Sequence, residues 1–153
     1  MTAATEGFAG GKLLLGREGQ IATIIFNHPD RMNAIELEMW AELARLVLEL
    51  DKDDNIRVLI FRGAGERAFS AGADISRFAE ERSNSAQARE YSEQFLPGLD
   101  AIDAFSKPTL SLIRGACVGG GIELASATDI RIAGELSRFG VPVAKLGLVA
   151  GYS

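Results

Sequence analysis

The sequence contains a single cysteine and a single histidine, and both scarcities limit the chemistry that the chain can perform. Cys117 alone can form neither an internal disulfide nor a cysteine-rich zinc site, and such low cysteine usage is typical of a reducing cytosol. His28 alone, beside Pro29 in a predicted turn, offers too little for a histidine-based metal site or a Ser-His-Asp triad. We therefore interpret Cys117 as a small buried apolar residue and His28 as a turn residue.

Long apolar runs and a basic surface are absent as well. No window approaches the length of a membrane span, and the N-terminus has no basic segment followed by an apolar stretch, so we expect a cytoplasmic protein without membrane contact. The net charge is −5 with scattered Lys and Arg, which argues against nucleic acid as a partner. The 153 residues, 47% of them hydrophobic, fit one domain with a sizeable core.

Apolar patterns along the chain predict strands that alternate with helices. We expect a flexible leader over residues 1–12 and one core domain over residues 13–153. The predicted elements, in chain order, are a β-hairpin of Leu13–Arg17 and Ile21–Phe26, a helix over Glu36–Leu50, a strand at Val58–Phe61, an irregular loop from Gly63 to Asp74, a helix from Asp74 or Ile75 through Ala79, a helix over Ala86–Phe105 with a kink or break at Pro97-Gly98, a strand at Thr109–Ile113, a short helix over Gly120–Ala127, a strand at Asp129–Ala133 and an irregular apolar loop over Phe139–Val143. This order, with mostly apolar strands, indicates an α/β fold with a buried sheet.

Three consecutive glycines at 119–121 precede a helix-compatible run that has Glu123 near its start. Glycines let a ligand approach the backbone closely, and the first N–H groups of a helix have no intrahelical partner. These N–H groups can hold a carbonyl oxygen that becomes negative during a reaction, with Glu123 beside the reacting atoms. A purely structural interpretation fits this stretch equally well, with glycines that permit close packing and Glu123 favouring the helix dipole.

A second glycine-rich stretch follows the predicted strand Val58–Phe61. We expect Asp74 to cap a helix there, so that the N–H groups around Ala73 resemble those at Gly120. If the strand is a neighbour of Thr109–Ile113, both loops lie at one edge of the sheet. Their N–H groups can then be directed at a single point. Together the two glycine-rich stretches indicate a binding site more specifically than either stretch does alone.

The second stretch also contains a G-x-G-x-x-A pattern at 63–68, which formally satisfies a dinucleotide-binding fingerprint. That fingerprint requires a helix that runs on from Ala68, whereas small residues and another glycine follow. A nicotinamide enzyme is therefore a minor alternative.

Four motifs carry a resemblance to a known family: Pro29–Ala34, Ala68–Ile75, Gly119–Ala125 and Asp129-Ile130. In these motifs the sequence resembles the crotonase family, also called the enoyl-CoA hydratase/isomerase superfamily, and the resemblance extends from Leu13 to Ser153. It implies a crotonase-like spiral of repeated ββα units, an acyl-CoA thioester as substrate, no separate cofactor or metal, and a homotrimer or hexamer. Since the family continues with C-terminal helices beyond Ser153, we expect a truncated core, either a fragment or a chain that relies on another.

The resemblance also implies roles for individual residues. The backbone N–H groups of Ala73 and Gly120 would form an oxyanion hole for the thioester oxygen, and Glu123 would be the catalytic acid or base. Contacts with CoA are implied at Arg31, Asn33, Ala34, Ala71, Gly72, Asp74, Ile75, Gly119, Pro142 and Val143.

One position departs from the hydratase pattern. Hydratases carry a second glutamate directly after the proline of a motif like Phe139-Gly140-x-Pro142, where this chain has Val143. Valine cannot transfer a proton, so ordinary two-glutamate hydration should be impaired. Isomerisation, thioester hydrolysis and decarboxylation remain open on the same scaffold, as does a non-catalytic acyl-CoA-binding subunit.

Overall fold

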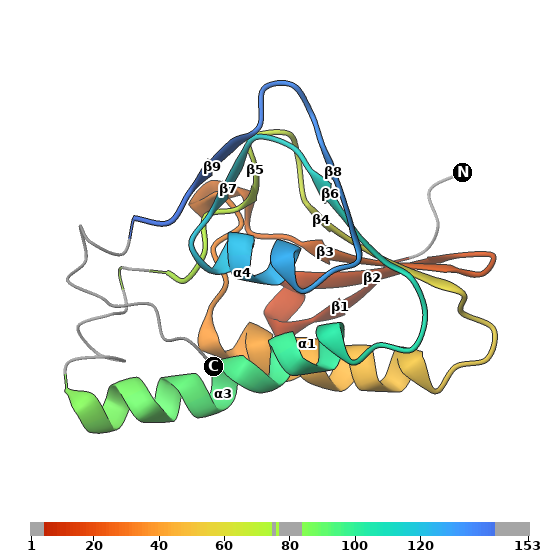
Figure 1. Cartoon of the computed structure of the whole chain (residues 1–153), viewed down its shortest axis with the longest axis horizontal. Coiled ribbons are helices and arrows are strands. Elements are labelled where there is room, and N and C mark those ends of the chain that lie inside the picture. Colours follow the sequence, from red (N-terminus) through yellow and green to blue (C-terminus); the bar gives the residue numbers. More distant parts are fainter. Residues whose placement is uncertain (1–4, 75, 77–83, 143–153) are drawn as a thin grey trace.

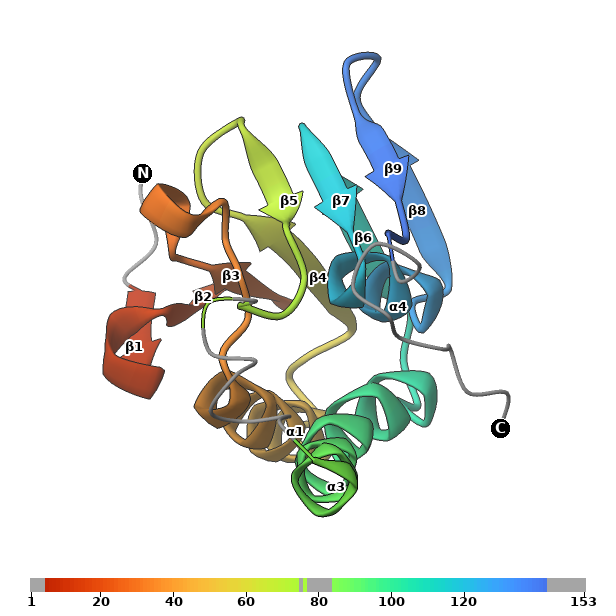
Figure 2. The same ribbon diagram turned by 90° about the vertical axis from the view of Figure 1, so that its left-hand side faces the viewer.

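The computed structural model describes residues 5–74, 76 and 84–142, which form two β-sheets flanked by helices (Figures 1 and 2). In this part of the chain the large sheet has the strand order β1-β2-β3-β4-β6-β8 and the small sheet the order β5-β7-β9. The strands are β1 (Thr5–Phe8), β2 (Leu13–Glu18), β3 (Ile21–Phe26), β4 (Val58–Gly63), β5 (Ala68–Ser70), β6 (Thr109–Ile113), β7 (Ala116–Val118), β8 (Ile130–Ala133) and β9 (Arg138–Gly140). The helices are α1 (Leu37–Asp51), α3 (Ser85–Asp103) and α4 (Gly120–Ser126), with 3₁₀ turns η1 (Ala9–Gly11) and η2 (Pro29–Arg31). The predicted α/β class is confirmed.

The large sheet contains every strand that the sequence predicts. β2 and β3 form the predicted hairpin, with an antiparallel register from Leu13↔Phe26 to Glu18↔Ile21. β3 pairs in parallel with β4, β4 with β6, and β6 with β8. β4 and β6 are therefore neighbours, which is the condition under which both glycine-rich loops lie at one edge of the sheet.

Helices α1 and α3 pack against each other and cover one face of the large sheet (Figure 2). The buried face of α1 is formed by Met39, Trp40, Leu43, Leu46, Val47 and Leu50. The Trp40 ring meets the Phe95 ring of α3 edge to face, with ring centroids 4.7 Å apart. The main core thus lies between the two helices and the sheet.

Helix α3 continues through Pro97, so of the kink or break predicted at Pro97-Gly98 the break is wrong. A proline inside a helix removes one backbone hydrogen bond. Gly98, however, is buried against α1, where a Cβ on Gly98 would lie 2.9 Å from Trp40 Cε3. The close approach of the two helices at this glycine offsets the bond lost at Pro97.

The small sheet is the feature that the sequence does not predict. β5 and β9 lie in segments predicted to be irregular loops, and β7 lies in the glycine-rich run before α4. Each is three residues long, and β7 pairs in parallel with both β5 and β9. Strands this short show no period-two alternation, so only pairing with distant segments defines them.

The N-terminal part also differs from expectation. The predicted flexible leader 1–12 includes β1, which pairs in antiparallel fashion with β2, and the turn η1. β1 is mostly exposed and pairs through its backbone, so its side chains give no apolar signal. The helix predicted from Asp74 to Ala79 lies almost wholly outside the described residues.

A repeated unit relates the two sheets. Each of β4, β6 and β8 in the large sheet is followed by a short strand of the small sheet, β5, β7 or β9 respectively. Figure 1 shows the chain turning at the top of the molecule between the two members of each pair. In the part of the chain that is described, no helix is long and apolar enough to cross a membrane.

Candidate functional site

The candidate site lies where β5 and β7 end side by side. Their parallel pairing, with Ala68 opposite Ala116 and Ser70 opposite Cys117, brings the following loops together. A Cβ on Gly72 would lie 2.7 Å from the Val118 oxygen and 2.9 Å from the Gly120 nitrogen, and the φ angle of Gly72 is +85°. Only glycine fits this crossing, because both the backbone angle and the space exclude a side chain.

The structure brings the three residues predicted to be catalytic close together around Gly120. A Cβ placed on Gly120 would lie 3.7 Å from the Ala73 nitrogen and 3.7 Å from Glu123 Oε2. Between described residues, and outside the helices and strands, no backbone hydrogen bond uses the Ala73 or Gly120 N–H. The first N–H groups of α4 have no acceptor within their own helix. The Ala73 and Gly120 N–H groups, which come from two different loops, therefore lie near one another.

The Ala73 loop is held from the opposite side by the segment that precedes α1. The Ile35 N–H donates to the Gly72 oxygen at 2.8 Å, and the Ala71 N–H donates to the Met32 oxygen at 3.0 Å. Ile35 and Ala73 form an isolated parallel β-bridge. Sequence analysis missed this contact, since nothing local links residues 32–35 to residues 71–73.

Ser70 is a second residue that sequence analysis missed. Its side chain is completely buried, and its Oγ accepts a hydrogen bond from the Gly72 N–H at 3.0 Å. Ser-x-Gly between a strand and a glycine turn is the local signal that could have indicated it. This bond fixes the residue immediately before Ala73.

Asn33, predicted to contact CoA, has a different environment. Its side chain is 1% exposed. Nδ2 donates to the Ala68 oxygen at 2.7 Å and to the Ala64 oxygen at 3.0 Å, while Oδ1 accepts from the His28 N–H at 3.0 Å. The amide is thus committed to backbone groups of three segments, so a ligand contact at Asn33 would have to use its backbone.

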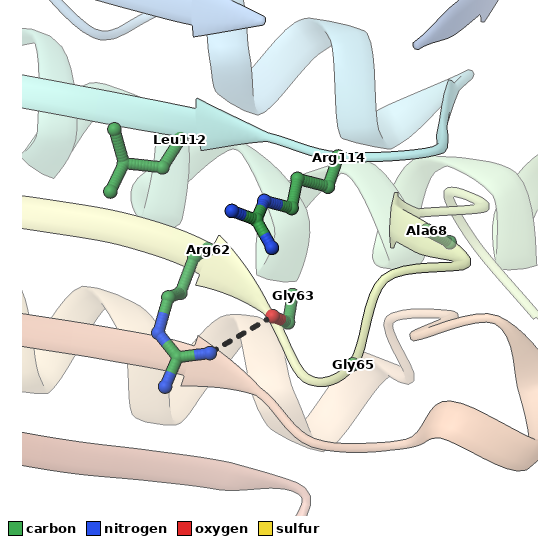
Figure 3. A pocket seen from close by; sticks show the side chains of 6 residues that line it. All are labelled: Arg62, Gly63, Gly65, Ala68, Leu112 and Arg114. Carbon is green, nitrogen blue, oxygen red and sulfur yellow. Dashed lines mark hydrogen bonds between the residues drawn. The ribbon is translucent and has the colours of Figure 1, made fainter. Parts of the chain in front are cut away.

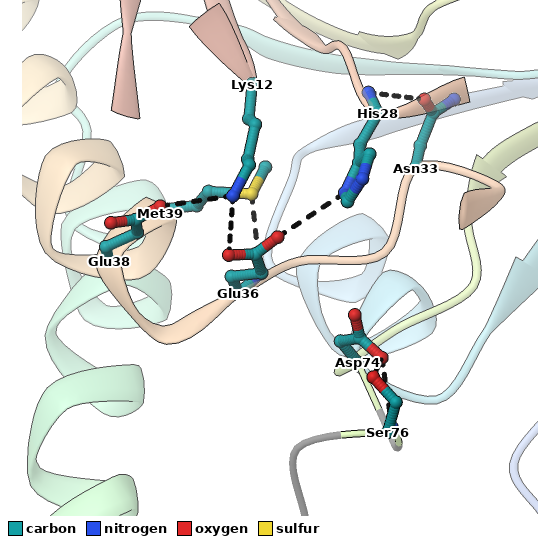
Figure 4. Close-up of polar contacts among 8 residues, drawn as sticks. All are labelled: Lys12, His28, Asn33, Glu36, Glu38, Met39, Asp74 and Ser76. Atoms are coloured by element: carbon teal, nitrogen blue, oxygen red, sulfur yellow. Dashed lines mark hydrogen bonds and ion pairs between the residues drawn. The ribbon is translucent and has the colours of Figure 1, made fainter. Parts of the chain in front are cut away.

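Polar side chains cluster around the start of α1 (Figure 4). The nearly buried Glu36 accepts a hydrogen bond from Lys12 Nζ at 2.7 Å, and its other oxygen lies 3.6 Å from His28 Nδ1. Asp74 Oδ1 accepts hydrogen bonds from the hydroxyl and the N–H of Ser76. The hydroxyl bond is the main reason that the pKa of Asp74 lies below its ordinary value. Asp74 therefore remains a carboxylate near neutral pH.

The other predicted CoA contacts stay predictions. Arg31 and Pro142 are exposed, Ala34 is buried, and Ala71 is half-buried. The Gly119 N–H donates to the Gly140 oxygen at 2.9 Å, which ties this loop to β9. Ile75 and Val143 lie outside the described residues.

Two cavities occur elsewhere in the described part of the molecule. One of about 190 Å³ lies at the ends of β4 and β6, between Arg62 and Arg114 (Figure 3). Both guanidinium groups are engaged, since Arg62 donates to the Gly63 oxygen and Arg114 pairs with Glu66 at 2.7 Å. None of the residues predicted to be catalytic or to bind CoA lines this cavity.

The second cavity, about 160 Å³, is lined by residues that include Cys117, Ile122 and Phe139. Cys117 is fully buried, and burial raises the pKa of its thiol to about 11, which leaves it protonated and unreactive at neutral pH. This agrees with its interpretation as a small core residue.

Two other site types find no support. Ala68–Ser70 is a strand, so the helix that a dinucleotide fingerprint requires after Ala68 is replaced by β5. Among the described residues, no three His, Cys, Asp or Glu side chains are grouped to hold a metal ion.

Comparisons with known proteins bear on the same region. The sequence model of the family described as "Enoyl-CoA hydratase/isomerase" matches residues 16–153. The chain is 33% identical over 140 residues to a short-chain-enoyl-CoA hydratase of Clostridium acetobutylicum and 34% identical over 140 residues to a crotonyl-CoA hydratase of Syntrophomonas wolfei. Each alignment covers 92% of this chain and 53% of the relative. The chain thus spans about half the length of these curated relatives.

The fold has close counterparts among solved structures. A structure described as an enoyl-CoA hydratase/carnithine racemase from Magnetospirillum magneticum superposes with a TM-score of 0.91 at 42% sequence identity. The match covers 97% of this chain and 54% of the other. The two-sheet arrangement is therefore that of a known group of proteins.

Proposed function

Because the chain belongs to the enoyl-CoA hydratase/isomerase superfamily and has its crotonase-like fold, we propose that it processes acyl-CoA thioesters. The Ala73 and Gly120 N–H groups bind the thioester oxygen and stabilise the enolate that forms when a proton leaves the adjacent carbon. The observation that supports this proposal is the closeness of three groups: a Cβ placed on Gly120 would lie 3.7 Å from the Ala73 nitrogen and 3.7 Å from Glu123 Oε2. In this proposal the two hydrogen-bond donors and the carboxylate surround one reacting group.

Glu123 is the acid or base of this proposal. Its carboxylate can take the proton from carbon or activate the water that adds to a 2-enoyl double bond. Acid–base groups of this kind contribute about 10²–10⁴-fold to a rate. With Val143 in place of a second glutamate, isomerisation of a 3-enoyl-CoA is favoured over hydration, because one base can move the proton between carbons.

Hydrolysis of the thioester and decarboxylation remain alternatives for the same site. Both use a stabilised thioester oxyanion or enolate, so the pair of N–H groups serves them equally. The proposal further includes a cytoplasmic location, a homotrimer or hexamer, and no cofactor besides the CoA thioester, since enolate chemistry here needs only N–H groups and a carboxylate.

A second candidate function is a non-catalytic acyl-CoA-binding or assembly subunit. Val143 favours it, because a valine replaces a proton-transferring residue. A subunit of this kind would bind acyl-CoA at the same site but would catalyse no reaction.

Calorimetric titration tests the proposal. We expect a 3-ketoacyl-CoA, whose enolate form resembles the intermediate, to bind more tightly than free CoA, because only the former places a charged oxygen between the two N–H groups. Binding of free CoA with an affinity equal to or higher than that of 3-ketoacyl-CoA would contradict the proposed oxyanion hole. A folded sample that binds neither ligand would contradict acyl-CoA binding by this chain.

Turnover of 2-enoyl- and 3-enoyl-CoA by Glu123→Gln separates the two candidates. For an enzyme we expect kcat to fall by about 10²-fold or more with little change in acyl-CoA affinity. Glu135→Gln is the matched control, since Glu135 is an exposed carboxylate in the turn between β8 and β9. Equal activity of the Glu123 and Glu135 variants would exclude Glu123 as the acid or base, and absence of turnover in the unaltered chain would favour the binding subunit.

A further inference from the structure

We propose that Asn33 is a positioning residue that holds the Ala73 N–H in place, and that its side chain does not contact CoA. This proposal rests on the proposed function, in which that N–H binds the thioester oxygen. It replaces the role that sequence resemblance implies for the Asn33 side chain with one drawn from its contacts. Asn33 would act on the reaction only through the backbone of another loop.

Burial separates the Asn33 side chain from any ligand. Only 1% of the residue is exposed. Both classes of hydrogen-bonding atom in the amide are used inside the chain, Nδ2 as donor to the Ala68 and Ala64 oxygens and Oδ1 as acceptor from the His28 N–H. A contact with CoA would require these buried bonds to break, at the cost of leaving buried polar groups unpaired.

The position of the amide explains how it can influence Ala73. Asn33 binds the first residue of β5 through the Ala68 oxygen, and its neighbours bind the end of the same segment. The Met32 oxygen accepts from the Ala71 N–H, and the Ile35 N–H donates to the Gly72 oxygen. Residues 32–35 therefore lie along residues 68–73, with the Asn33 amide as the side-chain anchor at one end.

The space around the amide leaves little room for adjustment. A Cβ on Gly63 would lie 2.6 Å from Asn33 Nδ2 and 2.2 Å from the Ala68 oxygen. Asn33 itself has a φ of +55°, a conformation that asparagine tolerates better than most residues. The sequence thus combines a residue suited to this backbone with a side chain that spans two loops.

Glu36 fixes the other end of this segment. It is 8% exposed and accepts a hydrogen bond from Lys12 Nζ at 2.7 Å (Figure 4). The segment is therefore held at both ends. Lys12, just before β2, binds Glu36, and the turn between β4 and β5 binds Asn33. By contrast, Gly120 on the other side of the site is held by α4 and by the bond from the Gly119 N–H to the Gly140 oxygen.

The test uses Asn33→Gly, which removes the amide but keeps a residue that accepts a φ of +55°. We expect the affinity for free CoA to be unchanged and the preference for 3-ketoacyl-CoA over free CoA to fall by about tenfold to a hundredfold, as for a displaced hydrogen-bond donor. With enoyl-CoA substrates, kcat should fall while KM stays nearly constant. Loss of affinity for free CoA with an unchanged ketoacyl preference would overturn the proposal.

Asn27→Ala is the matched control. Asn27 Nδ2 also donates to a backbone oxygen, that of Gly11 at 2.9 Å, but it has no hydrogen bond to residues 68–73. This variant should lose some stability, less than Asn33→Gly because it removes one side-chain hydrogen bond and not three, and should keep the ketoacyl preference. If both variants reduce the preference equally, the effect is general loosening, and Asn33 has no positioning role.

A measurement without ligand keeps this inference separate from the proposed function. In Asn33→Gly, or in the same-shaped Asn33→Asp if the glycine variant does not fold, amide exchange of Ile35 and Ala71 should accelerate and the Ala73 amide resonance should shift. Unchanged amides would overturn the positioning role even if acyl-CoA binds. Changed amides in a chain that shows no ketoacyl preference would support it and contradict the proposed function alone.

Discussion

The large and small sheets differ in what holds them together. In the large sheet, side chains such as Leu59 and Phe61 are fully buried under α1 and α3, and each contributes about 1.5–3 kcal/mol by leaving water. In the small sheet, the three-residue strands pair through their backbones, and only a few of their side chains, such as Phe69 and Cys117, belong to the core. The large sheet supplies most of the stability, whereas the small sheet sets the positions of the candidate site.

Glycines mark the places where the small sheet meets its surroundings. A Cβ on Gly121 would lie 2.7 Å from the Ser70 oxygen, so α4 rests directly on the backbone of β5. Gly72 makes the corresponding crossing between the two loops. A Cβ on Gly72 would lie 2.9 Å from the Gly120 nitrogen. Backbone contact is a precise way to fix N–H groups, because no flexible side chain lies between them.

The largest expected effect on stability comes from a substitution in the core of the large sheet. Phe61→Ala should lower the free energy of unfolding by about 3–5 kcal/mol, since it removes a fully buried ring from the core. Urea denaturation measures this change. Ile21→Ala in β3 is the control, because Ile21 is 41% exposed and should cost far less. Equal losses for both variants would contradict the assignment of the core to this sheet.

A substitution in the small sheet should lower stability less than Phe61→Ala does, but should reduce ligand discrimination more. Gly72→Ala forces a side chain onto a φ of +85° and against the Val118 oxygen, at a cost of about 1–3 kcal/mol. We expect it to abolish the preference for 3-ketoacyl-CoA over free CoA in titrations.

Gly65→Ala provides the control for the glycine experiment. Gly65 also has a positive φ, +70°, but nothing lies within 4 Å of its would-be Cβ. It should therefore lose some stability through backbone strain and keep the ligand preference. If Gly65→Ala and Gly72→Ala behave alike, the crossing of the two loops is not what positions the N–H groups.

The smallest effect concerns the link between β6 and β8. Asp129 Oδ2 accepts hydrogen bonds from the Thr109 N–H and hydroxyl, both at 2.8 Å, and these bonds hold the pKa of Asp129 below its ordinary value of 3.8. Because the folded-state pKa is depressed, the stabilisation is present above pH 3.8 and is lost as the pH falls below it.

Asp129→Asn should therefore be less stable than the unaltered chain at pH 7, by about 1 kcal/mol or less, and the difference should shrink near pH 3. Thermal unfolding at both pH values measures this. Asp54→Asn, in the exposed loop after α1, is the control for a general loss of charge. A difference that grows on acidification would have the wrong sign for this carboxylate.

Much of the fold could be predicted from local patterns. The hairpin β2–β3, the helix α1 and the strands β4 and β6 follow from apolar side chains at the period of each element, because those side chains face one core. The three-residue strands had no such pattern. The break expected at Pro97 failed for the related reason that Gly98 packs on Trp40, a contact distant in sequence.

The sequence by itself determined strands β2, β3, β4, β6 and β8 of the large sheet, helix α1, and the two glycine stretches with Glu123, since these depend on residue type and on near neighbours. Only the tertiary structure decided that β5 and β7 pair, that Gly72 meets Gly120, and that the Asn33 amide is buried against Ala68. These contacts join segments about 35 to 48 residues apart, and each of them involves backbone groups of at least one partner. Backbone groups are the same in every residue, so their partners are fixed by how the whole chain folds.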